Sequence, residues 1–333
     1  MKLTLKQWIQ VFLSFGVAIW IFWFLYKDIS QEALLEGLRE TSGFWLGLSI
    51  LISIIGFWLR AWRWKLLIQV GESDSIPTKR VLLALMIGYL ANLLVPRAGE
   101  IARCGALKKT EGIQIGKLFG TVILERTIDL IFLVSTISIA FLIEKDLFLS
   151  LLSDLVSLET LGDRISSALP LLLGGALVAS IFIYLVFQKY RDHGLFQKFQ
   201  HFIRDIIKGF ISLKQVRNQF GFWSSSVLIW AIYYLTMYFV ALAIPSTASL
   251  SAGSVLMVMV MGSIGMIAPV QGGIGTFHAL VAFILMAYGL TNEEGKIFAV
   301  IVHGSQVLTV IVLGTIASAV FLKLSAKKEP KSS

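Results

Sequence analysis

VLLALMIGYLANLLVPRAG (residues 81–99) and AGSVLMVMVMGSIGMIAPVQGGIG (residues 252–275) are the two stretches that decide the fold. Each is an apolar run that stops at a proline, Pro96 or Pro269, and has a glycine three residues further on. Proline removes a backbone donor and breaks a helix interior, and both runs are shorter than the roughly 20 residues that a straight spanning helix needs. The two stretches therefore predict broken membrane segments instead of plain crossings.

The composition places the chain in a membrane. Of 333 residues, 56% are hydrophobic and only 15% are charged, and the mean hydropathy is +0.81. Such a chain cannot close around one soluble core. A single cysteine, Cys104, and four histidines without metal-ligand spacing predict no metal site and no cofactor. The net charge of +9 is attributed to loops that face anionic lipid, and no nucleic-acid partner is expected.

Six other segments are long enough to cross the bilayer as helices. Five of them carry few or no internal charges: Trp8–Tyr26, Phe44–Leu59, Ser167–Phe187, Phe222–Ile244 and Ile297–Leu322. The sixth, Phe119–Ile143, contains Glu125, Arg126 and Asp129. The first segment is followed by an acidic loop and not by a small-residue cleavage site, so a retained helix is expected there.

The charges of the short loops orient these segments. The positive-inside rule puts the N-terminus, residues 60–80, residues 189–221 and the C-terminal tail in the cytoplasm, and the acidic loop 27–42 outside. If residues 81–95 crossed the bilayer as a single span, the basic stretch 97–117 would lie outside and the acidic loop 144–166 would lie in the cytoplasm. Both loops would then contradict the positive-inside rule. Two re-entrant hairpins remove the conflict, one over 81–117 from the cytoplasm and one within 245–296 from outside. Full crossing by 81–95 and 276–290 stays open as the alternative.

The predicted fold is an all-α integral membrane protein with about six spanning helices and two oppositely oriented re-entrant helical hairpins. Each hairpin is followed by a similar sequence at the opening of a long helix, Gly116-Lys-Leu-Phe119 and Gly295-Lys-Ile-Phe298. This similarity suggests an inverted repeat, by which many secondary transporters build a site at the bilayer midplane. Chance similarity between short apolar arms is the alternative.

We expect one polytopic membrane domain, residues 1–333. Its parts are two N-terminal spanning helices (1–80), the first hairpin with the charged helix (81–143), a basic amphipathic cytoplasmic helix (190–221), and the second hairpin with the last spanning helix (252–322). In residues 190–221 apolar side chains recur at helical spacing opposite a basic face, as in helices that lie on the cytoplasmic leaflet. Arg60-Ala-Trp-Arg-Trp-Lys65 similarly predicts an interfacial anchor of tryptophans and snorkelling bases.

Ionisable residues gather around the first break and on the next helix. They are Arg97, Glu100, Arg103, Glu125, Arg126 and Asp129, with Asn92 beside them. Charges and bare backbone are tolerated at membrane depth only where they are paired, buried in protein or wet, so a polar cavity is expected. The arginines and the asparagine would bind an anionic headgroup, because a guanidinium matches phosphate geometry. The carboxylates would balance charge or accept protons. A structural latch of ion pairs between hairpin and helix is the alternative.

The second break contains Gly272, Gly273 and Gly275, which permit a close approach of the chain to a bound headgroup. Free N–H groups at the start of the following arm, Thr276–Tyr288, would favour an anion. His278 lies one turn into that arm and is a candidate for proton coupling, with a hydrogen-bonded packing role as the alternative. His303 and Gln306 on the last spanning helix could face the same cavity.

Together these residues resemble the flippase-like membrane region of lysylphosphatidylglycerol synthases, which also occurs as free-standing membrane proteins. The resemblance rests on Arg60-Ala-Trp-Arg63-Trp64, on Asn92, Pro96, Arg97, Gly99, Glu100 and Arg103, on Glu125-Arg126-x-x-Asp129, and on Pro269-x-x-Gly272-Gly273-x-Gly275. Gln271 and His278 depart from it, since family members commonly have proline and glutamate there. The resemblance implies lipid translocation between leaflets, and no soluble synthase domain is expected in this chain.

The expected function is that of a lipid flippase or transporter in the cytoplasmic membrane, which moves an anionic or zwitterionic headgroup through a polar cavity. The expected partner is the membrane lipid, and homo-oligomerisation is left open. A membrane-embedded lipid-modifying enzyme is the second hypothesis, but no convincing nucleophile or metal set supports it, so no enzymatic activity is expected. A non-transporting scaffold for a lipid-synthesis partner is the third.

Overall fold

The computed structural model of the chain is helical and contains no strand among the residues that it describes. These are residues 16, 20–27, 29–70, 76–95, 98–147, 149–150, 213–268 and 270–326. The predicted span Ser167–Phe187, most of the predicted basic helix 190–221, and Pro96, Arg97 and Pro269 lie outside them. The chain divides into two compact units, residues 1–140 with 213–333, and residues 141–212. The features described below belong to the first unit.

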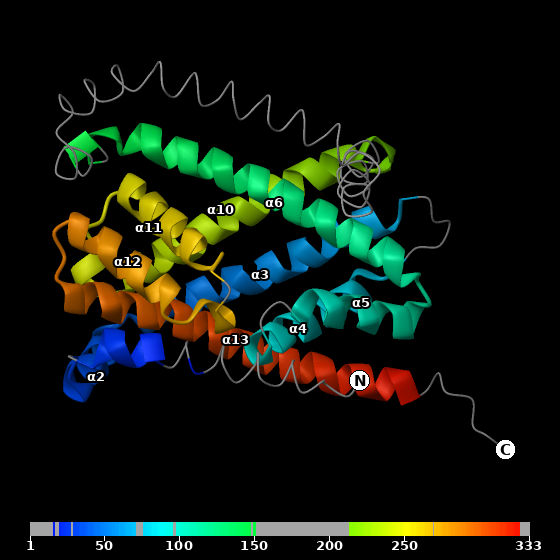
Figure 1. Ribbon diagram of the computed structural model, residues 1–333, viewed down its shortest axis with the longest axis horizontal. Coiled ribbons are helices and arrows are strands. Elements are labelled where there is room, and N and C mark those ends of the chain that lie inside the picture. Colours follow the sequence, from blue (N-terminus) through cyan, green and yellow to red (C-terminus); the bar gives the residue numbers. More distant parts are fainter. Residues whose placement is uncertain are drawn as a thin grey trace, which may run out of the picture. The chain divides into compact units, whose positions relative to one another are not determined.

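Four described helices are long and apolar enough to cross a membrane, and they lie where four of the spans were predicted (Figure 1). They are α3 (Gly43–Ile68), α6 (Ile115–Ile143), α10 (Gln219–Ala243) and α13 (Asn292–Ala326). Helix α3 continues well past the predicted end at Leu59 because Arg63 and Trp64 are buried in the protein and lie on a helical face with Gly56. Of the first predicted span, residues 20–26 are helical.

The predicted loop 27–42 contains a further short helix, α2 (Gln31–Glu40). Its first turn is capped by Ser30, whose hydroxyl oxygen accepts a hydrogen bond from the Ala33 N–H at 3.1 Å. This helix was not predicted, because its mixed composition and short length give no membrane signal.

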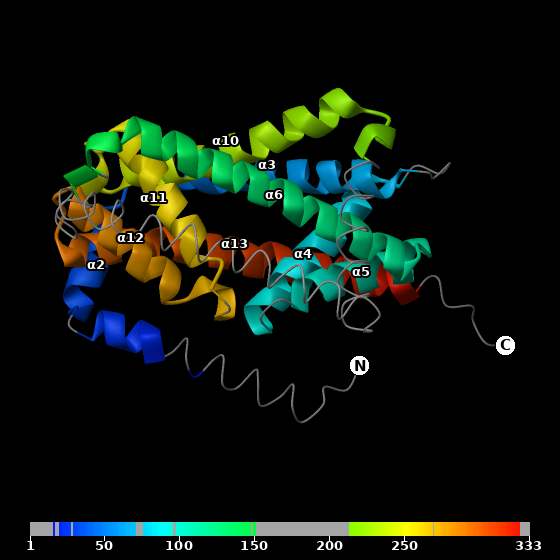
Figure 2. The same ribbon diagram turned by 45° about the horizontal axis from the view of Figure 1, so that its top comes forward.

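Both predicted breaks separate short helices that pack against each other in pairs (Figures 1 and 2). The first pair is α4 (Thr78–Leu94) with α5 (Ala98–Glu111), and the second is α11 (Ala252–Gly265) with α12 (Thr276–Ala287). At 1.5 Å per residue the four arms rise about 18 to 26 Å, against about 30 Å of hydrocarbon. No arm is therefore long enough for an untilted crossing.

The α4–α5 turn is held by close backbone packing. The Asn92 side-chain oxygen accepts a hydrogen bond from the Gly99 N–H at 2.7 Å. Gly88 on α4 faces the Gly99 carbonyl so closely that a Cβ atom at Gly88 would lie 2.8 Å from it. The sequence places glycine on both sides of this contact, because only a residue without a side chain lets the two helices approach so near.

The second break is a short 3-10 turn, η3 (Gln271–Gly273), followed by the N-terminus of α12. Gly272 and Gly275 adopt φ angles of 55° and 89°, in the left-handed region that favours glycine. The Thr276 hydroxyl donates to the Gly265 carbonyl at 2.7 Å and so ties α12 back to the end of α11.

The two breaks lie against each other. Helix α4 packs against η3, and the Gln271 side-chain amide donates a hydrogen bond to the Leu93 carbonyl at 2.8 Å. Leu93 is in the last turn of α4, where helix carbonyls lack partners within the helix. The bond therefore satisfies one such carbonyl with a residue from the other break.

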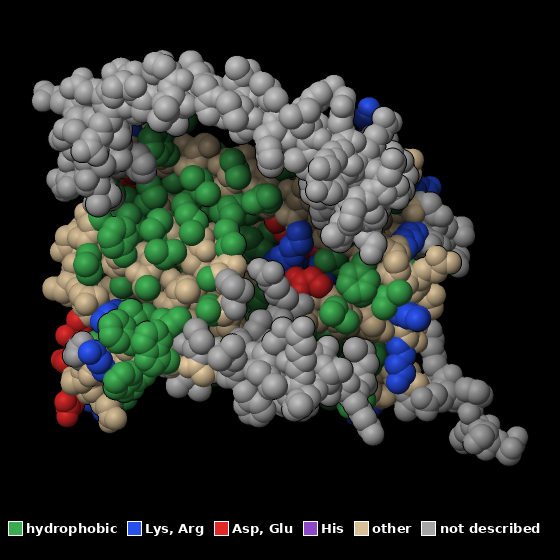
Figure 3. Space-filling model, viewed as in Figure 1, with side chains coloured by type: hydrophobic (Ala, Val, Ile, Leu, Met, Phe, Trp, Pro, Cys, Tyr) green, Lys and Arg blue, Asp and Glu red, His purple; other side chains and the backbone are tan. Residues whose placement is uncertain are grey.

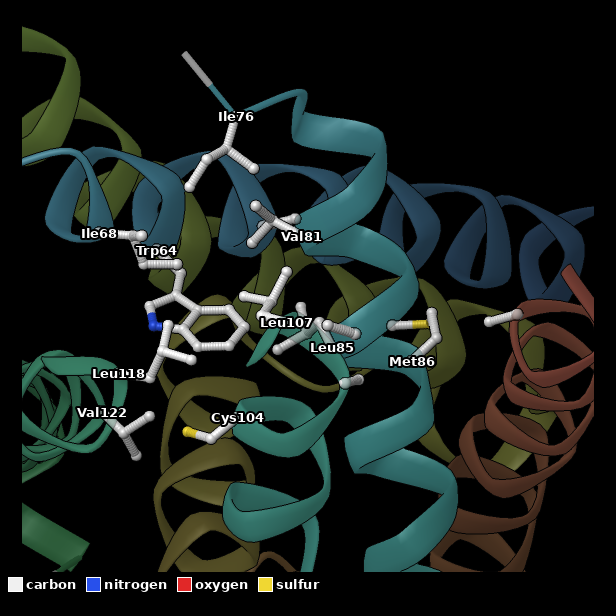
Figure 4. Packing of buried hydrophobic residues seen from close by; sticks show 14 residues of the cluster. Trp64, Ile68, Ile76, Val81, Leu85, Met86, Cys104, Leu107, Leu118 and Val122 are labelled. Carbon is white, nitrogen blue, oxygen red and sulfur yellow. The ribbon is translucent and has the colours of Figure 1, made fainter. Parts of the chain in front are cut away.

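A buried apolar cluster fixes the positions of α3, α4, α5 and α6 (Figure 4). Figure 4 shows the Trp64 side chain among Leu85, Leu107 and Leu118, all of which are fully buried. The indole N–H donates to the Thr121 hydroxyl on α6 at 3.0 Å. This packing brings the charged positions of α3, α5 and α6 close together.

Candidate functional site

A buried carboxylate on α6 is surrounded by arginines from two other helices. Glu125 is fully buried, and its Oε1 atom lies 3.3 Å from Arg60 Nη2 and 3.3 Å from Arg63 Nη2 on α3. Its Oε2 atom lies 2.8 Å from Arg103 Nη1 on α5. Burying an ion is costly unless it is paired, and here one carboxylate meets three guanidinium groups.

Asp129 extends this arrangement by one helical turn. Its Oδ1 atom accepts a hydrogen bond from Arg63 Nη2 at 2.7 Å, and its Oδ2 atom lies 3.7 Å from Arg60 Nη2. Residues four apart on a helix share a face, so α6 presents Glu125 and Asp129 side by side toward α3.

Uncharged partners hold the arginines in place. The Arg103 guanidinium lies 4.3 Å from the Trp64 ring centroid, within cation–π range. Arg60 Nη1 donates to the Tyr233 hydroxyl on α10 at 2.8 Å. The arginine side chains are thus oriented by aromatic residues as well as by the carboxylates.

The arrangement reaches the protein surface through a second ion pair. Arg126 on α6 lies 3.2 Å from Glu100 on α5, and their side chains are 44% and 27% exposed. Figure 3 shows basic and acidic side chains gathered in a hollow between hydrophobic ones. We call the whole set the charge cluster: Arg60, Arg63, Glu100, Arg103, Glu125, Arg126 and Asp129.

A small recess adjoins the charge cluster between α4, α5 and α6. Its lining residues are Leu85, Gly88, Tyr89, Asn92, Gly99, Glu100, Arg103 and Arg126. The lining therefore combines leucine and glycine with guanidinium, carboxylate, amide and phenol groups. Such a mixture suits a small polar group attached to an apolar body.

The structure brings six of the predicted first-break residues together: Asn92, Glu100, Arg103, Glu125, Arg126 and Asp129. Arg97 lies outside the described residues, so its predicted binding role stays a prediction. The ion pairs between α5 and α6 are those that the latch alternative describes.

Arg60 and Arg63 belong to the site, although the sequence predicted them as part of an interfacial anchor and not as binding residues. The predicted interfacial anchor is wrong for Arg63 and Trp64, because both are completely buried. A signal was present in the sequence: Ser49, Ser53 and Gly56 lie on the same helical face as Arg63 and are all buried. Small and polar residues at this spacing mark a helix face that packs inside the protein.

The second break does not join the charge cluster through any ion pair that the described residues make. His278 is buried, and its Nδ1 atom accepts a hydrogen bond from the Gly275 N–H at 3.2 Å. Its ring packs edge-on against Tyr26 and lies 4.9 Å from the ring of His303. This geometry fits the packing role that was the alternative for His278.

The free N–H groups predicted at the start of Thr276–Tyr288 stay a prediction, but two N–H groups just before that arm, those of Gly273 and Gly275, are already engaged. The Gly273 N–H donates to the Val270 carbonyl at 3.4 Å, and the Gly275 N–H is used by His278. In a tight turn the backbone N–H groups bond to acceptors within the turn itself. The glycine pattern alone does not show which N–H groups are used in this way. Gln306 donates to the Ser53 hydroxyl at 3.0 Å, so it links α13 to α3.

The described part of the chain holds no group of three or more His, Cys, Asp or Glu side chains that could bind a metal ion. Membrane-length helices around paired buried charges define the class of protein, a multi-pass α-helical membrane protein with a polar site. The model of the lysylphosphatidylglycerol synthase TM region family matches residues 11–314, so the chain belongs to that family. The match confirms the resemblance seen in the sequence. No curated protein and no solved structure matches the chain.

Proposed function

We propose that this protein moves the headgroup of an anionic or zwitterionic membrane lipid between the two leaflets, while the acyl chains stay in the bilayer. The family is named for the membrane region of an enzyme that makes a lipid, which supports a role with membrane lipids. The observation that carries the proposal is the charge cluster. Ionisable groups inside membrane helices cost roughly 2.5–3.5 kcal/mol each on the insertion scale unless they are paired or wet.

The pairing of charges alone would also fit a structural latch. Two features favour a binding site over a latch. Four guanidinium groups face only three carboxylates, so the cluster carries excess positive charge. The Arg126–Glu100 pair is also partly exposed beside a recess, where a headgroup could reach it.

The proposed topology has six spanning helices, two re-entrant hairpins and both termini on the cytoplasmic side of the cytoplasmic membrane. The short arms of α4, α5, α11 and α12 support the hairpins. Contact between Gln271 and Leu93 supports hairpins that enter from opposite faces and meet at their turns. Both Gly-Lys-x-Phe sequences lie near the start of a membrane-length helix, α6 or α13, which supports an inverted repeat.

We attribute no enzymatic activity to the site. Its guanidinium and carboxylate groups are engaged with one another and supply no nucleophile activated by a free base. The scaffold alternative predicts that purified protein leaves lipids in their original leaflet.

Reconstitution tests the proposal. Purified protein is placed in vesicles with phospholipids labelled on an acyl chain, and a reductant that cannot cross the membrane bleaches the outer leaflet. Wild-type protein should let the bleaching proceed into the inner-leaflet pool. Arg126→Ala should slow this by about tenfold or more, since hydrogen bonds to charged groups contribute about 1.5–3 kcal/mol.

The matched control is Arg80→Ala, because Arg80 forms an ion pair with Glu111 at 3.6 Å outside the charge cluster. This variant should move lipid at the wild-type rate. Bleaching limited to the outer leaflet with wild-type protein would reject lipid movement, and equal rates for Arg126→Ala and wild type would remove the cluster from the mechanism.

A further inference from the structure

Two buried histidines hold the turn of the second break in place. The His278 Nδ1 atom accepts a hydrogen bond from the Gly275 N–H at 3.2 Å, across the first turn of α12. His303 on α13 hydrogen-bonds to the backbone of Gly272. The two rings lie 4.9 Å apart between centroids, and the residues are only 3% and 8% exposed. The turn is therefore held at two points by groups that can take up a proton.

The position of His278 excludes its protonated form while the turn is closed. A protonated imidazole carries a hydrogen on both nitrogens, so Nδ1 would point a donor at the Gly275 N–H, which is also a donor. The positive charge would lie at the N-terminus of α12, where the helix dipole disfavours a cation. His303 would be next to it. Protonation of His278 therefore requires the turn to open.

The elements around His278 supply no negative charge that would offset this. Helix α12 packs against α11 and α13, and α11 contains no ionisable residue. From α13 the ring of His303 faces His278, and from residues 20–26 the ring of Tyr26 does. The Tyr26 hydroxyl donates to the Lys296 carbonyl at 2.9 Å. Within the described part of the chain, no carboxylate forms an ion pair with His278.

The same turn connects the second break to the first. Gln271 donates a hydrogen bond to the Leu93 carbonyl at 2.8 Å. A Cβ atom at Gly272 would lie 3.4 Å from Leu93 Cδ2, so the turn is also in van der Waals contact with the end of α4. Asn92, next to Leu93, lines the recess and holds the Gly99 N–H. Loss of the bonds that hold the turn would therefore loosen the contact between the two breaks beside the recess.

We infer that His278 is a proton-operated lock: its neutral form holds the second break against the end of α4, and its protonation releases that contact. The inference deepens the proposed function, because the contact lies beside the recess, where a headgroup would pass between the breaks. Its consequence for lipid movement rests on that function.

The size of the effect follows from histidine chemistry. In the opened turn His278 is expected to titrate with the ordinary histidine pKa of about 6.5, whereas the closed turn holds it neutral. A proton that binds only the open form shifts the equilibrium toward that form. Between pH 7.5 and pH 5.5 the open form should therefore gain about tenfold in population relative to the closed form.

Hydrogen exchange read by mass spectrometry tests the lock without any lipid movement. Peptides that cover residues 271–279 are compared between wild type and His278→Gln in nanodiscs at the same pH, which cancels the intrinsic pH dependence of exchange. Glutamine at this helix position can accept from the backbone N–H that His278 holds, but it does not titrate. The ratio of wild-type to variant exchange rates should rise about tenfold from pH 7.5 to pH 5.5.

The vesicle assay measures the consequence for transport. Acyl-labelled phospholipid is added to the outer leaflet and moves at the chosen pH, and aliquots are returned to pH 7.5 before bleaching. Wild-type protein should move lipid up to about tenfold faster at pH 5.5 than at pH 7.5. His278→Gln should lose this pH response. Glu111→Gln, in the separate pair with Arg80, should keep it.

The outcomes distinguish the lock from the proposed function. A constant exchange ratio across the two pH values, or a full pH response of lipid movement in His278→Gln, would overturn the lock. Equal wild-type transport at both pH values would overturn its role in lipid movement. The predicted exchange without lipid movement at either pH would support the lock and overturn the proposed function instead.

Discussion

At the scale of single residues, Glu125 is the centre of the site. It has no exposed side-chain surface, and three arginines from α3 and α5 surround it. Removing its charge leaves those arginines buried with only Asp129 to balance them. The loss of one partner of a buried pair is much more damaging than the pair itself is stabilising.

We therefore predict that Glu125→Gln lowers the free energy of unfolding by about 3–5 kcal/mol, seen as a large drop in the melting temperature in detergent. Glu111→Gln is the matched control, because its pair with Arg80 is partly exposed, with side chains 20% and 31% accessible. Such a pair contributes about 0–1 kcal/mol. Equal melting temperatures for the two variants would mean that the charge cluster does not hold α3, α5 and α6 together.

The residue patterns predicted one half of this site and missed the other. Charges inside the apolar run of α6 and after the first break were visible because they interrupt hydropathy. Arg60 and Arg63 follow the end of an apolar run, where snorkelling bases are common, and Arg63 meets its partner Glu125 from 62 positions away in the chain. A local pattern does not contain that pairing, since it depends on how α3 and α6 pack.

At the scale of elements, the α4–α5 hairpin depends on how closely its arms approach. Gly88→Ala would place a Cβ atom 2.8 Å from the Gly99 carbonyl, and 3.2 Å from the Cβ of Arg103. Backbone atoms cannot move aside as the end of a side chain can. The arms must therefore separate, which shifts Arg103 away from Glu125.

We predict that Gly88→Ala destabilises the protein by about 1–3 kcal/mol, as overpacking typically does, and slows lipid movement in vesicles. Gly105→Ala on α5 is the control, because a Cβ atom there meets no other atom within 4 Å and alanine favours helix by up to about 1 kcal/mol. Melting temperatures and bleaching rates of the two variants test this together. A wild-type result for Gly88→Ala would show that the arms already sit apart.

The breaks themselves followed from the sequence, because proline and glycine limit a helix through covalent geometry. Their mutual contact did not. Gln271 and Leu93 are 178 positions apart, and neither position shows by its type that the other is near. Gln271 departs from the family pattern, and the fold gives the physical reason. Its side-chain amide donates a hydrogen bond to a carbonyl at the end of α4.

At the scale of the whole molecule, the positive-inside rule predicts the orientation of the chain, and the two proposed re-entrant hairpins bring the charges of all the loops into agreement with that rule. Cysteine labelling with a reagent that cannot cross the membrane tests this arrangement. The only native cysteine, Cys104, is buried, so Cys104→Ala gives a background for single new cysteines. Exposed positions are needed, and Lys108 on α5 and Asn292 at the start of α13 are both exposed.

Two further exposed positions serve as references: Glu36 on α2, which the proposed topology puts outside, and Lys323 on α13, which it puts in the cytoplasm. We predict that cysteine at Lys108 reacts from the same side as cysteine at Lys323, because a re-entrant hairpin returns α5 to the face from which α4 entered. Cysteine at Asn292 should react from the same side as cysteine at Glu36. Labelling of Lys108→Cys together with Glu36→Cys would instead make α4 a full crossing, and α5 would then carry its lysines outside against the positive-inside rule. In that case the helices that carry the charge cluster would cross the bilayer in other directions than those proposed. The two breaks would then no longer enter from opposite faces.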